Sequence, residues 1–164
     1  MRNNDIPRGA CQICGRSIGI KTGVIAHHGY TRPQHQGYQT SSCEGAKHLP
    51  YELSCDAIEG AIQRRLNYTE QCRLDVVNLH ANPPAELVRF DTYGRRSVTA
   101  ARPEGFDAQA ALRQTSYAMR DNYALLFSNK IRQLHRQIEG TFKEVNYLRT
   151  RKDAWVAPST LVEG

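Results

Sequence analysis

The chain has 164 residues and a formal net charge of +6 at pH 7, with 40% hydrophobic and 8% aromatic residues. This length corresponds to about one domain, and no stretch approaches the roughly 18 consecutive apolar residues of a membrane-spanning helix. The N-terminus carries no apolar signal segment, so we expect a cytoplasmic protein without membrane contacts. Lysines and arginines are spread along the chain, which favours nucleic-acid binding only slightly.

The five cysteines point to a metal site. An odd number of cysteines, in a chain expected to be cytoplasmic, argues against a disulfide framework. Two residues separate Cys11 from Cys14, a spacing typical of metal sites and of redox-active thiols. A redox motif of this kind follows a strand and opens a helix within a βαβ unit, and the surrounding sequence does not have that pattern. Metal binding is therefore the better interpretation.

The first third of the chain has the composition of a small zinc-held module. Residues 1–10 are polar and are predicted to form a disordered leader. Residues 11–53 are rich in Cys, His, Gly, Ser and Gln, and so small a module needs a metal because burial alone does not stabilise it. Two short β-like runs, Ile18 to Lys21 and Val24 to His28, lie on either side of Thr22 and Gly23. This arrangement predicts a β-hairpin.

A helical region is predicted over residues 54–156. Apolar side chains recur every three or four positions from Asp56 to His80, which predicts a helix that stops before the prolines at 83 and 84. Two further β-like runs follow, Leu87 to Asp91 and Ser97 to Ala101, and they predict an inserted β-hairpin over about residues 86–102.

The last third has the longest periodic pattern. With Ile131 at heptad position a and Leu134 at d, nine of the twelve a and d positions from Tyr117 to Trp155 are apolar. This pattern predicts a long helix with a coiled-coil seam, followed by a tail at residues 157–164. The expected fold is mainly α with a small N-terminal zinc finger, an α+β fold in which an antiparallel coiled-coil hairpin is combined with short β-hairpins.

A structural zinc ion needs four ligands in a tetrahedron, and Cys11 and Cys14 supply two of them. The candidates for the other two are His27, His28, His35, Cys43, His48 and Cys55. Cys43 is the strongest, because the small residues around it in "SSCEGA" allow close approach. On a strand His27 and His28 point to opposite faces, so only one of them joins the site easily.

Three elements in this order resemble a known pattern: Cys-x2-Cys-Gly, a short hairpin that ends in His-Gly, and Cys-x-Gly followed by a small residue. With the block "GVIAHHGYTRP…YQTSSCEGAKHLPYELSCD", residues 11–56 resemble a group of small, uncharacterised zinc-finger proteins of the phage and prophage type. The resemblance implies a Zn²⁺ site and a mobile-element setting, and it implies no reaction.

Carried over to this chain, the resemblance implies that Cys11, Cys14, His28 and Cys43 bind the metal. His27 or His48 remains the alternative to His28. Cys55 and Cys72 are interpreted as small buried side chains.

The expected function is recognition of a macromolecular partner without catalysis, with zinc serving the fold. Basic residues alternate with tyrosines in the predicted module, a mixture that suits either nucleic acid or a protein interface. The partner is therefore a bacterial host protein complex or nucleic acid, and the mobile-element setting favours binding to a host complex through the helical region. Val145, Leu148 and Trp155 are predicted to extend beyond the first helix, so a homodimer through this region is a further hypothesis.

The alternative hypothesis is an enzyme, a nuclease of the His-His-Asn type that uses His27 or His28 as general base. Such an enzyme also combines zinc-binding cysteines with paired histidines. Two observations weigh against it, because no Asn lies between residues 5 and 66 and no second Cys-x2-Cys follows Cys43. A histidine bound to zinc also cannot act as the base.

Overall fold

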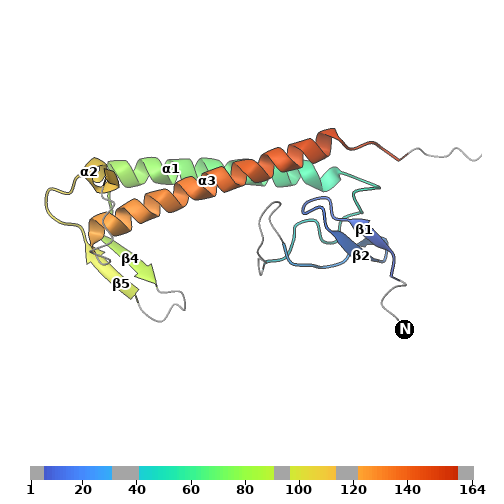
Figure 1. The fold of residues 1–164 in the computed structure, drawn as a ribbon, viewed down its shortest axis with the longest axis horizontal. Helices are drawn as coiled ribbons and strands as arrows, with labels where there is room; N and C mark the ends of the chain where they lie inside the picture. Colours follow the sequence, from blue (N-terminus) through green and yellow to red (C-terminus); the bar gives the residue numbers. More distant parts are fainter. Residues whose placement is uncertain (1–5, 31–40, 91–96, 114–121, 159–164) are drawn as a thin grey trace, which may run out of the picture. The chain divides into compact units, whose positions relative to one another are not determined.

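The computed structural model describes residues 6–30, 41–90, 97–113 and 122–158 (Figure 1). Helices make up about half of these residues, and two small antiparallel sheets complete a mixed α+β fold. The chain divides into two compact units, which we call the terminal unit (Met1–Asn67 and Thr141–Gly164) and the middle unit (Tyr68–Gly140). None of the described helices is both long enough and apolar enough to cross a membrane.

The sheet of the terminal unit has the order β1-β2-β3, with β1 at Arg8–Ala10, β2 at Ser17–Lys21 and β3 at Val24–Ile25. The β2 and β3 strands confirm the predicted hairpin. Thr22 and Gly23 both have positive φ angles, 49° and 82°, as the tight turn of a two-residue hairpin requires. β3 is shorter than predicted, because Ile25 next pairs with the loop at Lys47 and His48.

β1 corrects one prediction, since residues 8–10 belong to a strand and not to a disordered leader. Its three residues pair with β2 in antiparallel register, Arg8 with Gly19 and Ala10 with Ser17. The Glu52 carboxylate also accepts a hydrogen bond from the Ala10 amide, at 2.9 Å. These partners are distant in sequence, so the polar composition of residues 1–10 gave no sign of them.

The first long helix, α1, spans Asp56–Ala81 and confirms the helix predicted from Asp56 to His80. Two side chains cap its N-terminus. Ser54 Oγ accepts a hydrogen bond from the Asp56 amide at 3.2 Å, and Gln12 Oε1 accepts one from the Ala57 amide at 2.9 Å. Gln12 is fully buried, so the residues between Cys11 and Cys14 are anchored directly to the start of α1.

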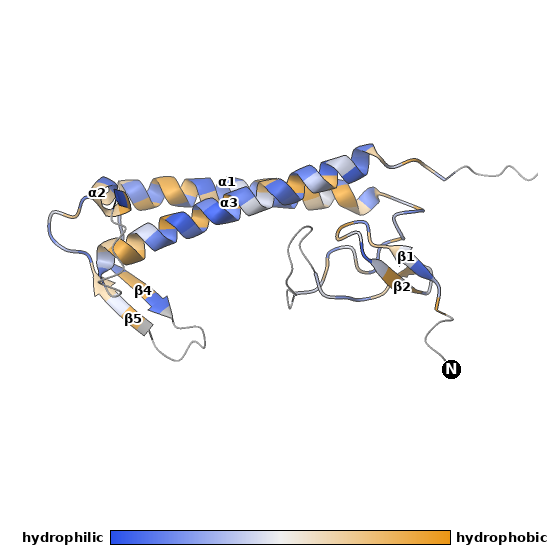
Figure 2. Cartoon of the chain, in the orientation of Figure 1, coloured by the Kyte–Doolittle hydropathy of each residue, from blue (hydrophilic) through white to orange (hydrophobic). Residues whose placement is uncertain are grey.

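The last helix, α3, spans Tyr123–Asp153, and the expected start at Tyr117 lies outside the described residues. Asn122 caps the helix, because its side-chain oxygen accepts a hydrogen bond from the Ala124 amide at 2.8 Å. The helix continues through Gly140. Apolar and polar positions alternate along both α1 and α3 (Figure 2).

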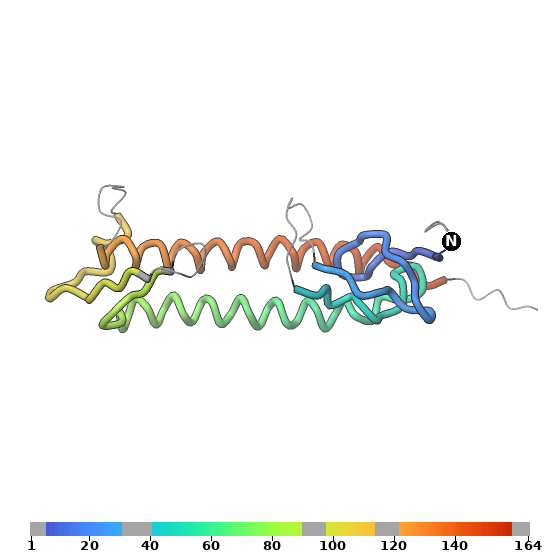
Figure 3. Tube along the Cα trace, turned by 90° about the horizontal axis from the view of Figure 1, so that it is seen from below, coloured from blue at the N-terminus to red at the C-terminus, as the bar shows by residue number. Residues whose placement is uncertain are grey.

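The predicted apolar face of α3 is buried at most of its described a and d positions, namely Ala124, Phe127, Ile131, Leu134, Thr141, Val145 and Leu148. In the terminal unit α1 and α3 run antiparallel (Figure 3), as the ion pair from Lys152 to Glu59 and that from Arg65 to Glu144 require. Coiled-coil pairing of the two helices stays a prediction.

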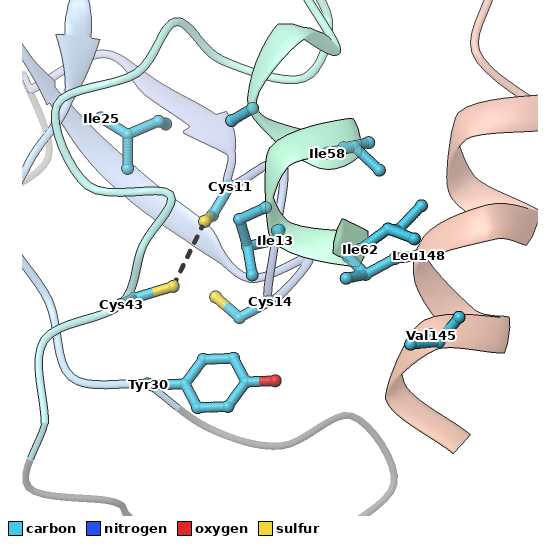
Figure 4. Packing of buried hydrophobic residues seen from close by; sticks show 12 residues of the cluster. Cys11, Ile13, Cys14, Ile25, Tyr30, Cys43, Ile58, Ile62, Val145 and Leu148 are labelled. Atoms are coloured by element: carbon cyan, nitrogen blue, oxygen red, sulfur yellow. Dashed lines mark hydrogen bonds between the residues drawn. The ribbon is translucent and has the colours of Figure 1, made fainter. Parts of the chain in front are cut away.

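The core of the terminal unit joins the metal-site region to both helices (Figure 4). Its buried members are Cys11, Ile13, Cys14, Ile25, Tyr30, Cys43, Ala57, Ile58, Ala61, Ile62, Val145 and Leu148. Val145 and Leu148 are each 1% exposed, and the Trp155 indole donates a hydrogen bond to the Tyr51 carbonyl at 2.7 Å. Val145 and Leu148 are thus covered within one chain and Trp155 is partly covered, and self-association stays a prediction.

The middle unit has a second antiparallel hairpin, β4 (Glu86–Phe90) and β5 (Ser97–Ala101), as predicted. The predicted turn between these strands lies outside the described residues. A short helix, α2 (Ala108–Arg113), was not predicted from the sequence. Phe106, Tyr123 and Phe127 form the aromatic centre of this unit, with the Phe106 ring edge-on to both others.

Candidate metal centre

Four potential ligands converge in the terminal unit: Cys11, Cys14, His28 and Cys43. One ligand atom from each lies within 4.8 Å of the others. The sulfurs of Cys11 and Cys43 are 3.8 Å apart, and the Cys14 sulfur is 3.4 Å from His28 Nε2. The three cysteines are buried, and their sulfurs point into the same space (Figure 4). This cluster can hold a metal ion.

A tight turn after β1 brings Cys11 and Cys14 together. The Gly15 amide donates a hydrogen bond to the Cys11 carbonyl at 3.0 Å, and the Cys11 amide donates one to the Arg16 carbonyl at 2.9 Å. Gly15 has a φ of +72°, in the left-handed region that favours glycine. The turn therefore fixes both thiols on one side of the backbone.

His28 presents Nε2 to the cluster because its other ring nitrogen is occupied. Nδ1 lies 2.8 Å from the Ala26 carbonyl oxygen, which accepts a hydrogen bond only from a protonated Nδ1. Nε2 then keeps its lone pair, as a metal ligand needs. The Cys43 amide donates to the His28 carbonyl at 2.9 Å, and this bond aligns the last two candidate ligands with each other.

Gly45 allows Cys43 to approach the other thiols. A Cβ atom at this position would overlap the Cys11 sulfur and would also crowd Ile13. Only glycine fits here, which gives the small residue in "SCEGA" a geometric role.

The three thiols share their protons unequally. Hydrogen bonds from Cys11, from Cys43 and from the Arg16 amide hold the pKa of Cys14 far below its usual range. The pKa of Cys43 is raised, chiefly by its contact with Cys11, and the pKa of Cys11 is raised chiefly by Cys14. Three thiolates so close together repel one another, and a divalent cation is the natural means of stabilising them all.

The other candidate ligands lie elsewhere. His27 is exposed, and His48 Nδ1 is 3.9 Å from the Asp56 carboxylate, outside the cluster. Cys55 is partly buried and Cys72 is buried, and neither belongs to the cluster. His35 falls outside the described residues.

A buried ion network beside the cluster had no recognisable signal in the sequence. Arg65 donates to Glu144 Oε2 at 3.0 Å and to Glu44 Oε2 at 2.9 Å, and the Tyr30 hydroxyl donates to Glu144 Oε2 at 2.8 Å. Burial desolvates the Arg65 guanidinium, and the carboxylates of Glu44 and Glu144 together with the Tyr30 hydroxyl offset that cost. Burial, with the Glu144 carboxylate beside it, raises the pKa of Tyr30 well above its usual range.

Comparison of the chain with protein families, with curated proteins and with solved structures finds no match. The case for a metal site therefore rests on the positions and chemistry of these four side chains.

Proposed function

We propose that Cys11, Cys14, His28 and Cys43 bind one zinc ion. In a regular tetrahedron with Zn–S bonds of about 2.3 Å and a Zn–N bond of about 2.0 Å, S···S edges are about 3.8 Å and S···N edges about 3.5 Å. The corresponding separations are 3.8 Å between the sulfurs of Cys11 and Cys43 and 3.4 Å between Cys14 and His28. These two of the six edges match the tetrahedron, and all four ligand atoms lie within 4.8 Å of one another. This convergence is the observation that carries the proposal, and a thiolate-rich set is the kind that zinc prefers.

The zinc has a structural role. Protein side chains fill all four positions, whereas a catalytic zinc keeps one position for water or substrate. The chain around the site reaches α1 through Gln12 and α3 through Arg151, whose guanidinium donates to the Gln12 carbonyl at 3.2 Å and to the Cys11 carbonyl at 3.3 Å. Zinc then fixes these loops as a small zinc finger against the two helices.

The proposed activity is recognition of a macromolecule, either a bacterial host protein complex or nucleic acid, by a zinc-finger protein of the phage or prophage type. The resemblance of residues 11–56 supports the setting. One exposed cation, Lys47, lies on a turn of the proposed finger, where a partner has access to it. Engagement of His28 Nε2 by the cluster argues against this residue as a nuclease base.

Elemental analysis of the purified protein tests the zinc site. We expect one zinc per chain in the wild type and loss of that zinc in Cys43→Ser. Cys72→Ser is the matched control, because this cysteine is also buried but lies outside the cluster, so it keeps the metal. Gly45→Ala retains all four ligands and crowds Cys11, and its zinc affinity should fall at least tenfold. Stoichiometric zinc in both Cys43→Ser and Gly45→Ala would refute the site.

An assay for phosphodiester cleavage tests the absence of catalysis. The wild type, supplied with Zn²⁺ or Mg²⁺, should leave plasmid DNA and RNA intact. Cleavage that disappears in His27→Ala would establish the nuclease in place of the recognition protein.

A further inference from the structure

An open groove lies between β4 and α3 in the middle unit, apart from the metal cluster. Three cationic side chains line it: Arg89 from β4, and Lys130 and Arg136 from α3. Its apolar lining is formed by Leu87, Val88 and Leu126, and the Val88 side chain is 51% exposed. None of the described residues that line the groove is acidic.

The adjoining part of α3 is also rich in cationic residues and contains no acidic ones. From residue 122 to residue 138 the sequence contains no Asp or Glu, and the next acidic residue along the helix is Glu139. The exposed side chains of this stretch are amides, cations and one imidazole, namely Asn129, Lys130, Arg132, Gln133, His135 and Arg136. Amides and cations are the side chains that donate hydrogen bonds to phosphate and sugar oxygens.

The part of α1 in the same unit is different. There Arg73 pairs with Glu70 at 3.5 Å, and Gln71 donates to Asp75 at 2.9 Å, so positive groups and amides have acidic neighbours on their own helix. An ordinary solvated helix face has this mixture of signs. The charged residues that line the groove are all positive. This is a local property, because the middle unit as a whole has 10 cationic and 8 acidic side chains.

We propose that this groove binds single-stranded nucleic acid. The cations on its two sides contact phosphates, and the apolar floor accepts sugars and the faces of unstacked bases. A duplex keeps its bases stacked inside and offers nothing to an apolar floor, and an acidic peptide does not match the floor either. The inference names the partner class that the proposed recognition function leaves open, and it rests on that function but not on the zinc site.

Each phosphate contact releases a condensed counterion, so binding depends on salt. With three cations, a single strand should lose about 20-fold in affinity when salt rises from about 50 to about 200 mM. Fluorescence anisotropy with a labelled oligothymidylate of about 12 nucleotides measures this dependence. A duplex of the same length and an oligoglutamate peptide serve as competitors.

The decisive variant is Arg89→Gln/Lys130→Gln/Arg136→Gln, which should weaken binding at least tenfold and flatten the salt dependence. Its control is Lys21→Gln/Lys143→Gln/Arg149→Gln, which removes three exposed cations from the terminal unit and lowers the net charge by the same amount. We expect the control to bind within about threefold of the wild type, because none of its three cations lines the groove.

Three results would overturn the inference: no binding of the single strand by the wild type, equal losses in the two triple variants, or stronger competition by the duplex or the peptide. Zinc content measured on the same samples separates this inference from the metal proposal. A protein that holds zinc but does not bind the strand refutes only the groove, and one that binds the strand without zinc refutes only the metal site.

Discussion

The terminal and middle units enclose different kinds of core. In the terminal unit three cysteines lie among aliphatic side chains such as Ile13, Ile25 and Ile58, beside the ion network of Arg65 and Glu144. In the middle unit Phe106, Tyr123 and Phe127 pack ring against ring. Aromatic rings add specific ring-to-ring contacts to the apolar area that they bury, whereas buried thiols and charged groups need polar or metal partners. The terminal core consequently combines aliphatic burial with a polar network and a cluster that can hold a metal ion, whereas the middle core is mainly aromatic.

Metal removal should reveal the largest difference in stability between the two units. Structural zinc contributes an apparent 10–16 kcal/mol, roughly, to the folding of small zinc-held modules. A strong chelator should therefore abolish the hydrogen-exchange protection of β1, β2 and β3 while the amides of β4 and β5 stay protected. Hydrogen-exchange mass spectrometry with and without chelator measures both regions in one sample. Persistent protection of the first sheet after complete zinc removal would contradict the distinction.

Phe127→Ala should instead destabilise the middle unit and leave the metal site of the terminal unit unaffected. Phe127 is 0% exposed, and its truncation leaves a cavity that costs about 3–5 kcal/mol. Chemical denaturation should show this loss, while the zinc content is unchanged. Leu74→Ala is the control, because Leu74 is 49% exposed on α1 and its loss should cost under about 1 kcal/mol. Zinc loss in Phe127→Ala would show that the units do not act separately.

Glu144→Ala should destabilise the terminal unit by about 3 kcal/mol, because it leaves Arg65 buried without its closest interhelical carboxylate. The side chains of Arg65 and Glu144 are only 11% and 10% exposed. The double variant Arg65→Met/Glu144→Met should cost less than Arg65→Met and Glu144→Met added together. Equilibrium unfolding of these three methionine variants measures the coupling. The exposed pair of Arg73 and Glu70 provides the reference, with an expected coupling below about 1 kcal/mol.

The smallest expected change in stability comes from replacing glycines of the terminal unit. Gly60→Ala within α1 should raise the free energy of unfolding by about 0.5–1 kcal/mol, since the new methyl group meets only the mobile end of Arg64. Gly23→Ala is the matched change, because no atom lies within 4 Å of the added Cβ but its φ is +82°, so it should destabilise by about 1 kcal/mol. Thermal unfolding of both variants checks the opposite signs, and equal signs would contradict the argument.

The sequence predicted the elements whose signals are local. The 3.6-residue periodicity gave α1 and most of α3, and the Thr22–Gly23 turn between β-like runs gave the first hairpin. α2 was missed because its six residues are too few for a periodic pattern, although Asp107 caps it with hydrogen bonds of 2.8 and 3.2 Å from the Gln109 and Ala110 amides. The cluster of Cys11, Cys14, His28 and Cys43 was also anticipated, from spacing and resemblance together.

The sequence by itself thus determined most of the two long helices, the turn of the first hairpin and which side chains can bind a metal, because neighbouring residues decide periodicity, turn chemistry and ligand type. Tertiary structure alone decided that β1 pairs with β2, that Gln12 caps α1, that Arg65 meets Glu44 and Glu144, and that Val145 and Leu148 are covered. Each of these contacts joins segments separated along the chain. Their energies depend on distance and burial in three dimensions, and neither quantity is contained in local sequence.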